Sequence, residues 1–171
     1  VNISEVYYDH AGTDTGYEFV ELYNTSASPV DISGWFIEWG GTDFTYGFYE
    51  LPEGTVMGGN GYYLIGGDQV FTEFGVTPDI VVNFDPGLQN GGSATDGIRI
   101  YHTELRQYTD TLLYDTPNDN ALPDDDDAPC PDAQCAPAAD GGESLARSVP
   151  LVDTNNCFDD FVVNTTPDPQ S

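Results

Sequence analysis

A chain of 171 residues is long enough to bury a hydrophobic core within one domain. Its 30 Asp and Glu residues face three arginines and no lysine, so the formal net charge is −27. This charge repels phosphate groups, which excludes ordinary nucleic-acid binding and docking on anionic lipid. No apolar run approaches the roughly 18 residues of a membrane-spanning helix, so no membrane insertion is expected. Cations and neutral molecules remain as the expected partners.

Short segments rich in aromatic and β-branched residues alternate with turns along most of the chain, a pattern typical of β-strands. About nine short strands are predicted, within the segments 2–8, 17–24, 30–40, 44–50, 54–67, 79–84, 97–102, 107–115, 144–150 and 160–164. One helical turn is predicted within 68–76, where Val70, Phe71 and Phe74 have helical spacing. The fold class is therefore all-β, a β-sandwich formed by residues 1–171 as a single domain.

The composition changes between residues 116 and 142. This stretch holds four consecutive aspartates, Asp124–Asp127, five prolines and two of the three cysteines. We expect a long acidic surface loop, little of which enters the core, followed much later by a C-terminal tail at 165–171. Adjacent carboxylates on such a loop point in different directions, so we interpret the aspartate run as solvated charge.

Several motifs resemble, in order along the chain, one known family. They are NISEVYY and YEFVELYN near the start, then VDISGW, LPEGTVMGGNGYYLI, LQNGGSATDGIRIYH and GGESLARSVPLVDTNNCFDDFVVNTTPDP. Together they resemble the lamin tail domain as it occurs in bacteria. The resemblance implies an immunoglobulin-like β-sandwich and a non-enzymatic module. Some animal members are linked to DNA or chromatin binding, a property that the charge of −27 argues against here.

The resemblance also implies a context. Bacterial modules of this kind are typically attached to secreted or surface proteins, often beside nucleases or other hydrolases. The chain is therefore expected to be part of a larger extracellular or cell-surface protein, as a structural or adhesive module that binds another protein or a cell-surface component. An Asp-rich surface without lysine also suits a saline or calcium-rich medium, where cations relieve self-repulsion.

Acidic residues gather in and around the loop between the first two predicted strands. Ca²⁺ takes six to eight oxygens from carboxylates, carbonyls and waters, which such a loop can supply. A second acidic cluster begins at Asp153, and the two clusters would form one structural calcium site if the C-terminal strand lies beside the first hairpin. The alternative is solvated charge, which is frequent in so acidic a chain. The candidate ligands are Glu5, Asp9, Asp14, Glu18, Glu21 and Asp153.

Aromatic residues are dense around the predicted hairpin at 35–49. Exposed rings stack on sugars, so an alternative function is a carbohydrate-binding module that takes a polysaccharide through Trp39, Tyr46 and Tyr49. Alternation places Trp35, Ile37 and Trp39 on one face of a strand. We expect Trp35 in the core and leave Trp39 open between core and surface.

The three cysteines, Cys130, Cys135 and Cys157, lack zinc-ligand spacing. In an oxidising compartment a disulfide would staple the 116–142 loop. The short Cys130–Cys135 loop favours that pair, while bonds of either residue to Cys157 stay open. One thiol is left over in each case.

Catalytic motifs are scarce. Neither His10 nor His102 accompanies a nucleophile motif, and we interpret Gly91-Gly92-Ser93 as a β-turn. An enzyme would need a metal and a cleft built from Asp9, Asp14 and Asp153. A pocket that strongly raises the pKa of a carboxyl group would favour an enzyme, and a filled sandwich with only a small bound cation would argue against one. The sequence favours a non-catalytic module.

Overall fold

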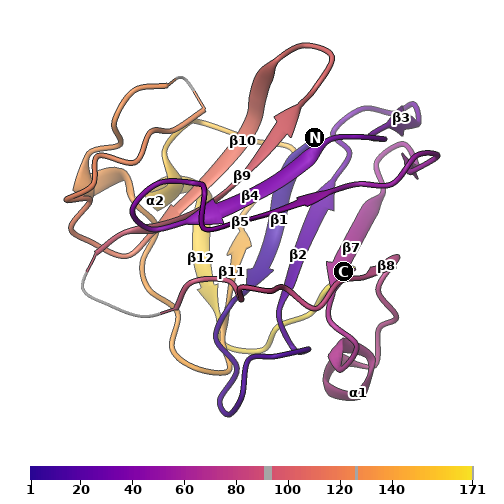
Figure 1. The fold of residues 1–171 in the computed structure, drawn as a ribbon, viewed down its shortest axis with the longest axis horizontal. Coiled ribbons are helices and arrows are strands. Elements are labelled where there is room, and N and C mark those ends of the chain that lie inside the picture. The colour runs from indigo at the N-terminus through magenta and orange to yellow at the C-terminus, as the bar shows by residue number, and fades with distance from the viewer. Residues whose placement is uncertain (91–93, 126, 171) are drawn as a thin grey trace.

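The computed structural model describes residues 1–90, 94–125 and 127–170 (Figure 1). Within them the chain forms two packed sheets, a third short strand pair and little helix, so the predicted all-β sandwich is confirmed. Twelve strands are present in these residues instead of about nine, chiefly because the predicted segments 30–40 and 54–67 each divide into two strands, at 30–31 and 36–40 and at 56–57 and 62–66. The β-turn expected at 91–93 lies outside the described residues.

The larger sheet has six strands in the order β12-β11-β1-β2-β7-β8. All neighbours are antiparallel except β7 and β8, which are parallel. The strands are β1 (Asn2–Tyr7), β2 (Phe19–Tyr23), β7 (Tyr62–Gly66), β8 (Ile80–Val81), β11 (Ser144–Arg147) and β12 (Phe161–Asn164). The C-terminal strands therefore do lie beside the first hairpin, because β11 pairs with β1.

The smaller sheet has four antiparallel strands in the order β10-β9-β4-β5 and lies in front of the six-stranded sheet in Figure 1. Its strands are β4 (Phe36–Gly40), β5 (Gly47–Glu50), β9 (Asp96–His102) and β10 (Gln107–Tyr114). The strands β3 (Val30–Asp31) and β6 (Val56–Met57) form the separate pair. The helices are short: α1 (Val70–Phe74), the 3₁₀ turn η1 (Asp132–Gln134) and α2 (Cys157–Asp160).

The core lies between the two sheets, where alternate side chains of each strand point inward. Val20 and Leu22 of β2 and Ile98 and Ile100 of β9 are fully buried in one cluster. A smaller cluster lies on the other face of the six-stranded sheet, where α1 places Val70 against Tyr7, Phe19 and Leu64. The helical turn expected within 68–76 is therefore confirmed as α1, and it covers part of a face that would otherwise be exposed.

The segment 116–142 differs from the expectation that little of it enters the core. Its apolar side chains pack at the end of the sandwich, and the buried ones are Leu122, Cys130, Cys135, Ala136 and Ala139. Asp124 is also buried, with burial raising its pKa to about 8, whereas Asp127 is exposed and Asp126 lies outside the described residues. The interpretation of the run as solvated charge is thus wrong for Asp124, because the folded segment encloses it.

No helix in the described part of the chain is long and apolar enough to cross a membrane.

Candidate cation site

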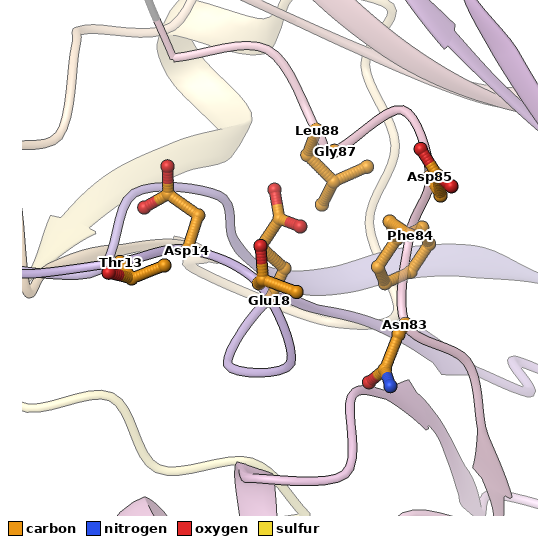
Figure 2. A pocket seen from close by; sticks show the side chains of 9 residues that line it. Thr13, Asp14, Glu18, Asn83, Phe84, Asp85, Gly87 and Leu88 are labelled. Atoms are coloured by element: carbon orange, nitrogen blue, oxygen red, sulfur yellow. The ribbon is translucent and has the colours of Figure 1, made fainter.

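A pocket of about 620 Å³ opens where the loop before β2 faces the segment at 83–88 (Figure 2). The loop contributes Asp14 and Glu18, and the segment contributes Phe84, Asp85 and Leu88. Figure 2 shows the Glu18 side chain between Asp14 on one side and Phe84 and Leu88 on the other. The full lining is Thr13, Asp14, Thr15, Glu18, Asn83, Phe84, Asp85, Gly87 and Leu88.

Glu18 is the most unusual group of this pocket. It is 1% exposed, and its Oε1 atom is buried without a hydrogen-bond partner in the structure. Burial raises the pKa of Glu18 to about 8; the Leu88 backbone hydrogen bond opposes this shift, and the charge of Asp14 adds to it. A buried carboxylate oxygen without a hydrogen-bond partner lowers the free energy of unfolding by about 1–3 kcal/mol. A proton or a cation that neutralises Glu18 would therefore stabilise the folded protein.

Core side chains hold the opposite wall of the pocket in place. The Trp39 indole N–H donates to the carbonyl oxygens of Pro86 at 3.1 Å and Gly87 at 3.2 Å. The ring of Phe84 packs edge-on against Trp39, with 5.3 Å between centroids. This anchoring places Leu88 and Gly87 against the Glu18 carboxylate, which is why the carboxylate is shielded from water.

Asp14 lines the pocket, and Asp9 lies beside Asp14 outside the lining, where both carboxylates contact Asn90. The Asn90 side-chain amide donates to Asp14 Oδ2 at 2.9 Å and to Asp9 Oδ1 at 3.4 Å, and the His10 backbone N–H donates to Asp14 Oδ1 at 2.9 Å. Burial, followed by the charge of Asp14, raises the pKa of Asp9. The structure therefore gathers three of the six candidate ligands, Asp9, Asp14 and Glu18, at one end of the sandwich.

Glu5 and Glu21 form a separate pair on the outer face of the six-stranded sheet, where they are register partners on β1 and β2. Glu5 accepts from the Ser144 hydroxyl at 2.5 Å, and Glu21 accepts from the Ser4 hydroxyl and the Gln170 backbone N–H. Burial raises the pKa of both, that of Glu21 to about 7. The C-terminal segment therefore covers this pair, and protein donors occupy its oxygens.

Asp153 lies in a third place, at the start of β1. It stands 3.8 Å from the Arg147 guanidinium, which also donates to the Ile3 carbonyl oxygen at 2.8 Å and to Asp110 at 2.5 Å. Asp9 follows the opposite end of β1, so the structure does not unite Asp153 with the first loop in one site. The same separation removes the cleft of Asp9, Asp14 and Asp153 that an enzyme was expected to need, although the Glu18 pocket does have the strongly raised carboxyl pKa that was expected to favour an enzyme.

No group of three or more His, Cys, Asp or Glu side chains in residues 1–90, 94–125 and 127–170 converges closely enough to hold a metal ion by itself. A cation in the pocket would thus take only part of its coordination from carboxylates. Hydroxyls, backbone carbonyls and waters would supply the rest, as is common for Ca²⁺. Calcium binding stays a prediction.

The aromatic residues of the carbohydrate hypothesis separate into core and surface. Trp35 is 4% exposed, as expected, and Trp39 is 2% exposed, because its ring lies where a side chain on Gly47 would be. Trp39 is therefore excluded as a surface platform. Tyr49 is half-buried against the core, and Tyr46 is 50% exposed.

The cysteines are buried and no disulfide bond joins any two of them. The Cys135 thiol is hydrogen-bonded to that of Cys130, which agrees with the preference for that pair but forms no covalent bond. Cys157 lies apart, accepting from the Leu113 backbone N–H at 3.3 Å. The disulfide also stays a prediction.

The wall of the pocket at 83–88 was not among the predicted site residues. Asn83, Asp85 and Leu88 lie about 70 residues from Glu18 along the chain, so no local spacing connects them. Glu18 itself was among the predicted ligands, and it directly precedes the strand FVELY, where an acidic residue beside buried neighbours is unusual.

The model of one protein family, described as the Lamin Tail Domain, matches residues 1–121. No curated protein and no solved structure matches the chain. The matched residues include the pocket, whereas the resemblance noted for 141–169 lies beyond them. The structure nonetheless adds β11 and β12 of that later segment to the same sheet.

Proposed function

Because the chain belongs to the lamin tail domain family, we propose that it is a non-catalytic interaction module whose Glu18 pocket binds Ca²⁺. The larger protein would be secreted or attached to the surface of a bacterium, and the module would hold it to another protein or a cell-surface component. The family is an immunoglobulin-like, non-enzymatic one, which supports the structural role.

The observation that carries the calcium proposal is the unpartnered Oε1 of Glu18 inside a pocket that Asp14 also lines. Bringing carboxylates together without a cation costs repulsion and desolvation, and a bound cation turns both costs into folding stability. A pocket of about 620 Å³ leaves room for water ligands beside the carboxylates. The net charge of −27 raises the local concentration of cations further.

Thermal unfolding in EDTA and in 10 mM Ca²⁺ tests this proposal. Extracellular calcium sites bind with a Kd of about 0.1–1 mM, so 10 mM Ca²⁺ should add about 2 kcal/mol and raise the Tm by roughly 4–8 °C. Glu18→Gln should lose most of that increase. Glu73→Gln, the same exchange at an exposed position of α1, should retain it. An equal Tm in EDTA and Ca²⁺, or an unchanged increase in Glu18→Gln, would contradict the proposal.

A further inference from the structure

The outer face of the four-stranded sheet carries aromatic side chains that the core does not use. Gly47 of β5 faces the Trp39 ring in the core, so Phe48, the next residue of the strand, points to the opposite, outer face, whereas Tyr46 lies in the turn before β5. Tyr46 is 50% and Phe48 is 66% exposed, although burial would stabilise such large apolar groups. A single exposed ring is common on protein surfaces, so the significance of Phe48 depends on the rings beside it.

The aromatic residues continue across the sheet, one ring on each strand. Phe48 of β5 lies beside Phe36 of β4, with 5.8 Å between ring centroids. Phe36 is the register partner of Tyr101 on β9, and Tyr101 lies 5.2 Å from Tyr108 on β10. Neighbouring strands are about 4.8 Å apart, so the rings follow one another at the spacing of the strands. We call Phe48, Phe36, Tyr101 and Tyr108 the aromatic strip.

At the centre of the aromatic strip, one positive and one negative side chain form an ion pair. Such a pair is unusual in a chain with 30 acidic residues and three arginines. Arg99, one of three arginines, pairs with Glu38 at 2.9 Å. Its guanidinium lies 3.7 Å from the centroid of the Tyr108 ring and 4.0 Å from that of Phe44, so the rings also hold the cation in place. A partner of the strip therefore meets polar hydrogen-bonding groups between rings, without a field of one sign.

We propose that the aromatic strip binds an extended, neutral polysaccharide. The apolar faces of sugar rings pack on aromatic side chains, and sugar hydroxyls pair with groups such as Glu38, Arg99 and the tyrosine hydroxyls. A second copy of the chain fits less well, since each copy carries −27 and the two repel one another. None of the aromatic residues that the sequence suggested for sugar binding belongs to the strip: Trp39 and Tyr49 face the core, and Tyr46 lies in the turn before β5.

Retention on insoluble polysaccharides tests the proposal, with microcrystalline cellulose, chitin and insoluble xylan as probes and EDTA in the buffer. EDTA separates this test from the calcium proposal, because the strip contains no part of the Glu18 pocket. The chain should be retained on at least one probe, and Phe48→Ala should weaken binding about 3- to 10-fold, the contribution of one stacked ring. Phe48 is 66% exposed, so this variant should keep the Tm of the parent.

Phe71→Ala is the matched control. Phe71 is 60% exposed on α1, the helix that packs on the six-stranded sheet. Phe71→Ala should therefore leave retention on the polysaccharides unchanged. Absence of retention on all three probes would overturn the proposal, as would an equal loss in Phe71→Ala, which would indicate unspecific adsorption. Concentration-dependent self-association that Phe48→Ala abolishes, without retention on any probe, would make a second copy the occupant and would also overturn it.

Discussion

The two ends of the first hairpin both bury carboxylates, but only one end supplies a cation for them. At the start of β1, Asp110 and Asp160 receive hydrogen bonds from Arg147, which is itself 5% exposed. At the start of β2, Glu18 receives one backbone hydrogen bond and keeps one buried oxygen without a partner. The carboxylates at both ends lose hydration energy on burial. At one end the charge of Arg147 compensates for this loss, whereas Glu18 receives only a backbone hydrogen bond.

The buried acidic residues of these two ends therefore fall into two kinds: Asp110 and Asp160, which pair with Arg147, and Glu18, which pairs with no side chain in the described structure. The Arg147 end links β1, β10, β11 and α2 through the hydrogen bonds of one guanidinium, although burial still raises the pKa of Asp110 to about 7 against the opposing charge of Arg147. The Glu18 end leaves one buried oxygen without a hydrogen-bond partner, which makes the pocket a candidate binding site. Four changes to the protein or its solution test this difference between the two ends, and the greatest loss of stability is expected for the first.

Arg147→Met should lower the free energy of unfolding by about 3–5 kcal/mol, because Asp110 and Asp160 would lose the charge that faces them. Urea unfolding measures this loss. Arg106→Met is the control, since Arg106 is exposed and the same exchange there should change the stability by less than about 0.5 kcal/mol. Adding Asp110→Leu to Arg147→Met should recover part of the loss. A loss below about 1 kcal/mol in Arg147→Met would contradict the structural role.

Calcium affinity should depend on pH through the Glu18 proton. With its pKa at about 8, Glu18 must release a proton before it binds the cation, so the affinity should fall up to about tenfold for each pH unit below 8. Isothermal titration calorimetry at pH 8, 7 and 6 measures this slope. An affinity that does not change over this range would place the bound Ca²⁺ elsewhere on the acidic surface.

Glu18→Gln should stabilise the calcium-free protein at pH 8 by about 1–2 kcal/mol, since it removes a buried charge. The folded-state pKa of Glu18 is raised above its unfolded value, so its contribution to stability is complete below the unfolded pKa and is lost as the pH rises through about 8. Glu21, with a pKa of about 7, acts in the same direction. The parent should therefore melt at a higher temperature at pH 5.5 than at pH 8.5, and Glu18→Gln should reduce that difference. A Tm that rises with pH would refute this assignment.

Removal of residues 165–171 should lower the free energy of unfolding by about 1 kcal/mol, the smallest of these effects. The removal takes one backbone hydrogen-bond donor from each of Glu5 and Glu21. The truncated chain should also show a lower pKa for Glu21, as water reaches the carboxylate. Comparing the pH dependence of its Tm with that of the full chain measures both. An unchanged pH dependence between pH 6 and 8 would show that the tail does not shield the pair.

Alternation and turn residues were sufficient to predict the sandwich, because both are local properties of the sequence. The same alternation placed Trp35 in the core but could not place Trp39, whose burial depends on Gly47 of the next strand and on Pro86 and Gly87. Cys157 and its neighbours form α2, a helix too short to leave a periodic signal.

The candidate site was predictable only in part, for the same reason. Acidic residues of the first loop were identified, because they lie close together in the sequence. Contacts between segments far apart in the sequence bury Glu18, and such contacts cannot be read from local spacing. The place of Asp153 beside Arg147 likewise depends on the folded structure. Composition also failed for the 116–142 segment, since scattered residues such as Leu122 and Ala136 fill the end of the core without forming a pattern.

The most direct test of the account is the titration of the Glu18 carboxyl carbon, followed by NMR with and without Ca²⁺. Without Ca²⁺ the account predicts a pKa of about 8, and with saturating Ca²⁺ a pKa well below that value, because the cation competes with the proton. The signal assigned to Glu18 should be absent from Glu18→Gln. Titration of Glu18 in the usual range of a glutamate, or a raised pKa that Ca²⁺ leaves unchanged, would contradict the claim that this pocket is the cation site.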